Sequence, residues 1–211
     1  MSDSNPFQLD PAEYDRWYDK YLPAYQSELA CLSKVLPDSG EGLEIGVGTG
    51  RFSGTLGIRW GLDPVREVLD RARRRGVGVV QGRGESLPFI PGSFDYVLIV
   101  TVLCFLSDPA RMIEEVREVL RPAGKLILGL IDRESFLGRL YQEKKRKSRF
   151  FQTAEFFTVP EVIKLLSPGA WKEVDICQTI FEMPPDIDSV QPPREGYGEG
   201  GFVVVSTRKT R

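Results

Sequence analysis

Between residues 42 and 130 the chain alternates short apolar runs with stretches whose apolar residues recur at helical spacing. The runs of strand character span residues 42–45, 58–62, 77–81, 94–100 and 125–130. Intervening helical faces are formed by Val65, Val68, Leu69 and Ala72, and by Met112, Ile113, Val116, Val119 and Leu120. This order constrains the fold strongly, because each helix returns the chain to the same edge of the sheet and the strands must then run parallel.

The two ends of the chain depart from this alternation. The first forty residues look helical, with Pro23 opening a second helix. Aromatic residues spaced by three and four fall near one helical stripe there: Tyr14, Trp17, Tyr18, Tyr21 and Tyr25. Near the other end, Thr158 and Glu161 form a capping box before a short helix. Two strand-like runs, 171–181 and 202–207, follow without a helix between them, so we expect them to pair antiparallel.

These patterns together predict an α/β fold in a chain of 211 residues, a length that fits one domain. We expect a Rossmann-like, open sheet of seven mostly parallel strands with helices on both faces. The last strand is expected to be antiparallel, and helices are expected to precede the sheet.

Composition narrows the classes of function. The chain carries 28 basic and 30 acidic side chains, whereas a dedicated nucleic-acid binder usually shows a basic excess. It has no histidine, which excludes Ser-His and Cys-His mechanisms, and we expect no metal site. Cys31, Cys104 and Cys177 form no CxxC pair and suggest buried thiols. The polar N-terminus and the lack of a long apolar run predict a cytoplasmic protein without a membrane partner.

A glycine-rich turn, Glu44-Ile45-Gly46-Val47-Gly48-Thr49-Gly50, follows the first predicted strand. Alternate glycines let the backbone turn sharply and let a ligand approach it closely. Arg51 stands where the dinucleotide fingerprint GxGxxG requires a glycine. Glu44 would repel pyrophosphate but suits a cationic ligand. Asp63, at the end of the second strand, can accept hydrogen bonds from ribose hydroxyls.

Four segments in chain order resemble the motifs of class I methyltransferases that use S-adenosylmethionine. They are LEIGVGTG at 43–50, GLDP at 61–64, GRGESLPF at 82–89 followed by GSFDYV at 92–97, and LRPAGKL at 120–126. The third segment looks like the UbiE-like, or type 11, subgroup. The resemblance covers about residues 43 to 130. It implies S-adenosylmethionine as the cofactor and S-adenosylhomocysteine as its product.

The resemblance also implies roles for the matching positions. Those expected to bind the cofactor are Glu44, Gly46, Val47 and Gly48 at its methionine end, Asp63 at the ribose, Pro64, Arg83, Gly84 and Glu85 at the adenine, and Thr101 and Val102 near the methyl donor. Arg83 departs from the pattern, because many relatives carry an aspartate there and arginine cannot accept a hydrogen bond. The adenine contact would then come from backbone atoms or Glu85, or Arg83 would stack on the ring.

The aromatic N-terminus has two interpretations. Tyr14, Trp17 and Tyr18 would either pack against the sheet edge or form a lid that excludes water and contacts the sulfonium. Phe105 stands where many relatives carry histidine and is expected to line an apolar pocket.

Methyl transfer does not require an essential base, because the sulfonium is already a good leaving group. If a proton must be removed, the candidates are Tyr18, Asp132, Tyr197 and Glu199. Tyr197 and Glu199 lie in the glycine-rich connector before the last strand, and we expect this connector to gate the substrate.

The expected partner is a small-molecule methyl acceptor, with no nucleic acid and with the protein as a monomer or homodimer. The basic run at 144–147 is expected to be a solvated helix face. The alternatives are an RNA or protein methyltransferase, a non-catalytic S-adenosylmethionine-binding protein and, more weakly, a nicotinamide-dependent oxidoreductase. Residues 1–211 would form one domain, with a helical cap at 1–40, a cofactor-binding core at 41–131 and substrate-side helices with an antiparallel hairpin at 132–211.

Overall fold

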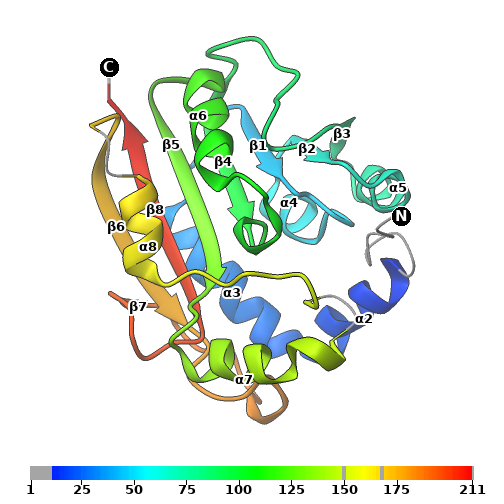
Figure 1. The fold of residues 1–211 in the computed structure, drawn as a ribbon. Coiled ribbons are helices and arrows are strands. Elements are labelled where there is room, and N and C mark those ends of the chain that lie inside the picture. The colour runs from blue at the N-terminus through cyan, green and yellow to red at the C-terminus, as the bar shows by residue number, and fades with distance from the viewer. Residues whose placement is uncertain (1–10, 149–150, 167–168, 211) are drawn as a thin grey trace.

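A computed structural model of the chain describes residues 11–148, 151–166 and 169–210. These residues form an eight-stranded sheet in the order β3-β2-β1-β4-β5-β8-β6-β7 (Figure 1). The strands are β1 (Gly42–Ile45), β2 (Trp60–Asp63), β3 (Gly78–Gln81), β4 (Phe94–Val100), β5 (Leu120–Ile131), β6 (Trp171–Thr179), β7 (Arg194–Glu195) and β8 (Phe202–Lys209). β1 to β5 run parallel, whereas β8 lies antiparallel between β5 and β6.

Helices cover both faces of this sheet (Figure 1). They are α2 (Pro11–Lys20), α3 (Leu22–Val35), α4 (Arg51–Leu56), α5 (Arg66–Arg74), α6 (Pro109–Val119), α7 (Phe136–Lys144) and α8 (Val159–Leu165), with 3-10 turns at Leu103–Phe105, Lys145–Lys147 and Pro184–Asp186. None of the helices in the described ranges is long and apolar enough to cross a membrane.

The central strand β4 shows how one sequence run serves two apolar layers. Tyr96, Leu98 and Val100 belong to the cluster that contains α3, whereas Val97 and Ile99 belong to the cluster that contains α6 and α8. Successive side chains on a strand point to opposite faces. A strand buried on both faces therefore reads as a continuous apolar run, which is why its bounds were predictable.

The predicted fold class is confirmed, with one added strand. β7 has only two residues, both exposed, and pairs antiparallel with Cys177 and Gln178 of β6. Because it carries no apolar alternation, the sequence predicts only a connector there. β5 also begins earlier than predicted, since Leu120 is fully buried and pairs with Phe94.

The signals at helix ends are confirmed. Pro23 lies in the first turn of α3, where its missing N–H costs no hydrogen bond. Thr158 Oγ1 accepts from the Glu161 amide at 3.3 Å, and Glu161 Oε2 accepts from the Thr158 amide at 2.9 Å. This reciprocal capping box begins α8.

All three cysteines are free and buried, as expected. The fold nevertheless joins two of them, because α3 packs on β6 and brings the sulfurs of Cys31 and Cys177 within 2.8 Å. The two cysteines are 146 residues apart in sequence, so no local pattern predicts this contact.

Phe202 is a test of the packing between β5 and β8. Its side chain is fully buried, and its ring lies so close to Gly129 that a Cβ there would be 2.8 Å from Phe202 Cζ. We expect Phe202→Ala to lower the free energy of unfolding by about 3–5 kcal/mol, because it leaves a cavity. Urea unfolding measures this change. Ile90, which is 79% exposed, is the control: Ile90→Ala should change the free energy by less than about 0.5 kcal/mol, and equal losses for the two variants would contradict the assignment.

Candidate functional site

The carboxyl ends of β1 and β4 meet where the chain changes sides of the sheet. β2 and β3 lie on one side of β1, and β4 and β5 lie on the other. A switch of this kind opens a crevice for ligands in doubly wound sheets. Gly46, just after β1, lies so close to Val102, beyond β4, that a Cβ at position 46 would overlap the valine side chain. Two segments predicted to bind one ligand therefore meet in space.

Gly48 provides free space on the same turn. Its φ of +51° favours glycine. A Cβ built there would meet nothing nearer than 4.0 Å, where a carbon of the Tyr14 ring and the Gly46 carbonyl oxygen lie. The turn thus presents bare backbone to an open space beside Tyr14, which a ligand could fill.

Glu44 is buried beneath this turn. Its Oε2 accepts hydrogen bonds from the backbone amide and the hydroxyl of Ser53, in the first turn of α4. Burial raises the pKa of Glu44 to about 8, an effect that these bonds only partly offset. Glu44 therefore caps a helix, and it also places a carboxylate where a cationic ligand would stabilise its ionised form.

Asp63 ends β2 and fixes the shape of the turn. Its Oδ2 accepts from the Gly48 amide at 3.0 Å, and its Oδ1 accepts from the Val65 amide at 2.8 Å. Burial raises the pKa of Asp63 to about 6, against the effect of both bonds. Glu44 and Asp63 are thus two carboxyl groups with a raised pKa beside one open space. They fit a ligand that carries a positive charge and hydroxyl donors.

On the predicted adenine side, the loop after β3 is only partly closed. The Arg83 side chain is 69% exposed and lies 3.5 Å from Glu85 Oε1, and Pro64 is exposed as well. Gly84 is buried against Met112 and Ile45. Arg83 thus pairs with the neighbouring acid, and the backbone of the loop is held close to the sheet.

Thr101 follows β4 with a strained backbone. Its φ is +53°, which is rare for a β-branched residue. Its amide donates to the Gly129 carbonyl oxygen at 2.7 Å, which holds this conformation. Strain of this kind is typical of functional positions, and Thr101 lines the cavity next to the turn.

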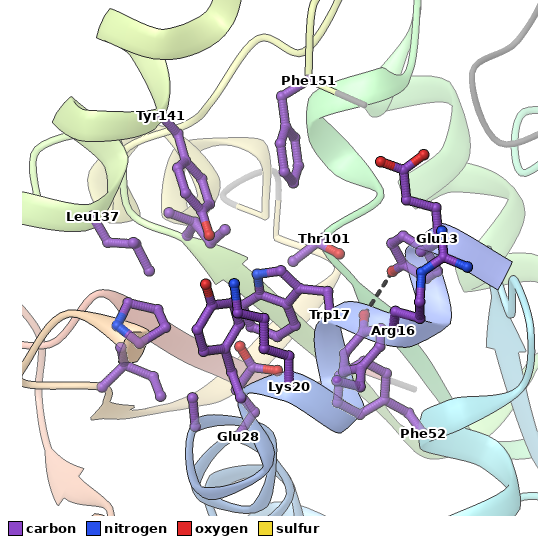
Figure 2. Close-up of a pocket in the computed structure, with 17 residues that line it drawn as sticks. Glu13, Arg16, Trp17, Lys20, Glu28, Phe52, Thr101, Leu137, Tyr141 and Phe151 are labelled. Atoms are coloured by element: carbon purple, nitrogen blue, oxygen red, sulfur yellow. Dashed lines mark hydrogen bonds between the residues drawn. The ribbon is translucent and has the colours of Figure 1, made fainter. Parts of the chain in front are cut away.

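That cavity has a volume of about 370 Å³. Its wall is mainly aromatic and aliphatic, with a few charged groups: Glu13, Tyr14, Arg16, Trp17, Tyr18, Lys20, Tyr21, Ala24, Glu28, Phe52, Thr101, Ile131, Leu137, Tyr141, Phe151, Ile180 and Pro184. Figure 2 shows Trp17, Thr101, Tyr141 and Phe151 converging on it from separate elements. Its size falls near the lower end of the range of about 300–1,000 Å³ typical of small-molecule sites.

Helix α2 lies beyond the carboxyl edge of the sheet and forms one side of the cavity (Figure 1). The hydroxyls of Tyr14 and Tyr18 are 2.6 Å apart, and Tyr18 packs on Phe52 of α4. Both alternatives for the aromatic stripe therefore have a structural basis, since the residues pack on the core and also cover the glycine turn.

Asp15 fastens α2 to the glycine turn. Its carboxylate accepts from the Thr49 hydroxyl at 2.7 Å, from Arg51 Nε at 2.9 Å, and from Arg75 and Arg71 at 3.0 and 3.3 Å. Burial would raise the pKa of Asp15, but these hydrogen bonds outweigh it and hold the pKa below its usual value. Arg71, in the last turn of α5, and Arg75, just after that helix, therefore share this acid as a partner.

The glycine-rich part of the connector before the last strand does not line the cavity, although Pro184, earlier in the connector, does. Tyr197 is 46% exposed, and Glu199 pairs with Arg194 at 2.9 Å. The amides of Glu199 and Gly200 both donate to Gln178 Oε1, which holds the connector beside β6. Tyr197 and Glu199 therefore lie away from this cavity, because β7 adds to the outer edge of the sheet, four strands from β4. Their role at the substrate stays a prediction.

Two other candidate bases, Asp132 and Tyr18, are also poorly suited to remove a proton from a molecule in the cavity. Asp132 is buried, accepts from the Glu134 amide at 3.2 Å and does not line the cavity. Tyr18 does line it, but burial, with the neighbouring Tyr14, raises its pKa well above the usual value. Tyr18 therefore keeps its proton near neutral pH and is a poor base.

Several wall residues were not predicted. Phe105 itself does not line the cavity; it stacks on Phe151, which does, at a centroid distance of 6.0 Å. Tyr141 stacks on the other side of Phe151 at 5.1 Å. Glu28 enters the cavity from α3, three residues after Tyr25. It continues the spacing of three and four residues that relates Tyr14, Tyr18, Tyr21 and Tyr25, and this spacing was the available signal in the sequence.

Comparison with known proteins identifies this arrangement. The family described as a methyltransferase domain matches residues 43–128. A solved structure from Thermotoga maritima, described as an S-adenosylmethionine-dependent methyltransferase and possible histamine N-methyltransferase, is 43% identical, with a TM-score of 0.94 over 97% of this chain and 99% of that chain. The chain belongs to the class I methyltransferases of the type 11 family. Its cofactor is S-adenosylmethionine.

Other relatives of this methyltransferase are less informative about its substrate. An uncharacterized protein from Methanocaldococcus jannaschii is 46% identical over 97% of this chain and 99% of its own length. The N-methyltransferase NodS from Bradyrhizobium japonicum, solved with S-adenosylhomocysteine, has a TM-score of 0.60 over 99% of this chain and 90% of that chain. Its identity is 17%, so that likeness concerns the fold alone.

The contribution of Asp15 can be tested by hydrogen exchange. We expect Asp15→Asn in this methyltransferase to speed amide exchange in α2, because three guanidinium groups lose their shared charge. The free energy of unfolding should fall by about 2 kcal/mol. Asp70→Asn, which removes an exposed pair with Arg73, is the control and should leave α2 unchanged. Normal exchange in α2 of Asp15→Asn would show that its carboxylate does not hold the helix.

Proposed function

We propose that this methyltransferase transfers the methyl group of S-adenosylmethionine to a small molecule bound in the aromatic cavity. The observation that carries the proposal is the position of Thr101, which joins the end of β4 to the cavity wall. A space of about 370 Å³ suits a small acceptor better than a polymer. The Thermotoga maritima protein is described as a possible histamine N-methyltransferase, and histamine belongs to the same size class.

Residues from four loops would hold the cofactor. Glu44 and the backbone at Gly46, Val47 and Gly48 suit the charged methionine end, and Asp63 suits the ribose hydroxyls. For the adenine we propose the backbone at Gly84 together with Pro64, Arg83 and Glu85. Thr101 and Val102 would lie beside the methyl donor.

The chemistry asks little of the protein beyond positioning. The bound cofactor supplies an activated methyl group on a sulfonium, and the acceptor must lie in line with it. Tyr14, Trp17 and Tyr18 would exclude water from the reacting groups, as a lid held by Asp15. No base candidate within the described residues is required for this step, in keeping with the lack of histidine.

For domain organisation, oligomeric state and location, the proposal follows the sequence. We propose one domain with a helical cap, a cofactor-binding core and substrate-side elements, acting as a monomer or homodimer in the cytoplasm. An RNA acceptor is less favoured, because Lys144 and Arg146 of the basic run are exposed and do not line the cavity.

The decisive experiment is transfer of a labelled methyl group from S-adenosylmethionine into a pooled metabolite extract, with the product identified by mass. We expect one small methylated product. Asp63→Ala should reduce transfer at least about tenfold, since the Asp63 carboxylate both shapes the turn and would bind the ribose. Binding of S-adenosylmethionine without turnover across the extract would instead favour a binding protein, and labelling of RNA or protein alone would favour a polymer acceptor.

The raised pKa values of Glu44 and Asp63 predict that cofactor binding depends on pH. With a pKa of about 8, Glu44 holds its proton near neutral pH in the free protein, whereas Asp63, with a pKa of about 6, holds a proton mainly below pH 6. A cationic cofactor favours their ionised forms, so its binding releases protons and its affinity rises with pH. We expect calorimetry to show an increase of about tenfold from pH 5.5 to 7.5. S-adenosylhomocysteine lacks the sulfonium charge and should show a smaller increase; an affinity for S-adenosylmethionine that falls with pH would contradict this role.

A further inference from the structure

Glu28 is a buried acid that has no partner among the residues described by the structure. Its side chain leaves α3 and is 8% exposed. Within the described residues its carboxylate makes no hydrogen bond or ion pair, and burial alone raises its pKa to about 8. Asp15 and Glu44, by contrast, each accept at least two hydrogen bonds. Burying a carboxylate without compensation is costly, so its position calls for a ligand.

The cavity surrounds Glu28 with aromatic rings. The negative charge of Glu28 contributes to the raised pKa of Tyr14, Tyr18 and Tyr141, which places all three phenols near it. Trp17 and Tyr21 line the same cavity. Figure 2 shows Glu28 entering from α3 toward Trp17, with Tyr141 across the cavity. A carboxylate inside a set of aromatic faces is a favourable site for an organic cation.

The other charged groups do not neutralise this acid. Arg16 and Lys20 are exposed on α2, and neither forms an ion pair with Glu28. The Lys20 ammonium lies over the Tyr21 ring at 5.0 Å. Glu13 and Arg16 have interactions of their own and lie together on the far side of Trp17 from Glu28 (Figure 2). The phenols of Tyr14, Tyr18 and Tyr141 carry no charge near neutral pH, and burial raises their pKa further above the usual value.

We propose that Glu28 binds a protonated nitrogen of the methyl acceptor, so that the acceptor is a small amine with an apolar body. This inference rests on the proposed function, since it assigns the substrate class of the same cavity. Glu28 acts as a specificity residue: its carboxylate pairs with the ammonium, and the rings of Trp17, Tyr21 and Tyr141 pack around the rest of the molecule. A neutral analogue of the same shape would find the same rings but no ion pair.

The physical basis is the difference between the free and the bound cavity. In the free protein Glu28 is largely protonated near neutral pH, because burial disfavours the charged form of its carboxyl group. An ammonium group that enters the cavity stabilises the ionised form of the Glu28 carboxylate, because charges are poorly screened in this region. The cavity thus selects for positive charge although the whole chain carries a net charge of only −2.

The test uses matched amines and alcohols. Wild-type protein saturated with S-adenosylhomocysteine is titrated at pH 7.5 with a panel of small aryl- and alkylamines, each beside its isosteric alcohol. We expect amines to bind at least about tenfold more tightly than their alcohols. Glu28→Gln should remove this preference while alcohol binding changes little, and Glu28→Asp should retain part of it. Glu143→Gln, on the exposed surface of α7, removes the same charge outside the cavity and should behave as wild type.

The outcomes separate this inference from the proposed function. Equal amine affinity in wild type and Glu28→Gln, no preference for amines over alcohols, or binding of no amine in the panel would each overturn the role of Glu28. The affinity for S-adenosylhomocysteine is measured independently in every variant and shows whether the fold is intact. If amine selectivity is present but the cofactor product does not bind, the proposed methyl transfer fails while the amine site stands.

Discussion

The carboxylate of Asp15 is the interaction on which the site depends. It joins α2 to Thr49 of the glycine turn and to arginines at the start of α4 and near the end of α5. Without this acid, three guanidinium groups would repel one another around the turn. With it, Tyr14 and Tyr18 are held over the end of β1, where they form part of the wall of the cavity.

Three other acids have fewer hydrogen bonds or ion pairs to offset their burial. Glu44, Asp63 and Glu28 all have a raised pKa, and burial is the first cause in each case. Tyr14 lies within the electrostatic reach of all three. The site is therefore rich in acids that lack cations, although the protein as a whole is nearly neutral. That pattern suits a cationic cofactor, and at Glu28 it suits a cationic acceptor.

Local patterns predicted most of the fold. β1 and β4 have their predicted bounds, and the capping box before α8 forms as the sequence indicates. The cofactor-binding residues could be predicted for the same reason, because Glu44 to Gly50 is a contiguous segment and Asp63 follows it closely in sequence. The residues on the acceptor side could not be predicted. Tyr197 and Glu199 seemed well placed, yet β7 draws them to the outer edge, and Tyr141 and Phe151 reach the cavity from a part of the chain that carries no motif.

The sequence by itself determined the order of strands and helices, the glycine turn and the class of cofactor. These follow from spacings of two, three and four residues and from side chains adjacent along the chain, where geometry is set by local backbone rules. Only the tertiary structure decided that Asp15 meets Arg75, 60 residues away, and that Glu28 lies among aromatic rings with no partner in the described part of the chain. Such contacts depend on how whole helices pack on the sheet, and burial, which sets the charge of these acids, is a property of that packing and not of any local pattern.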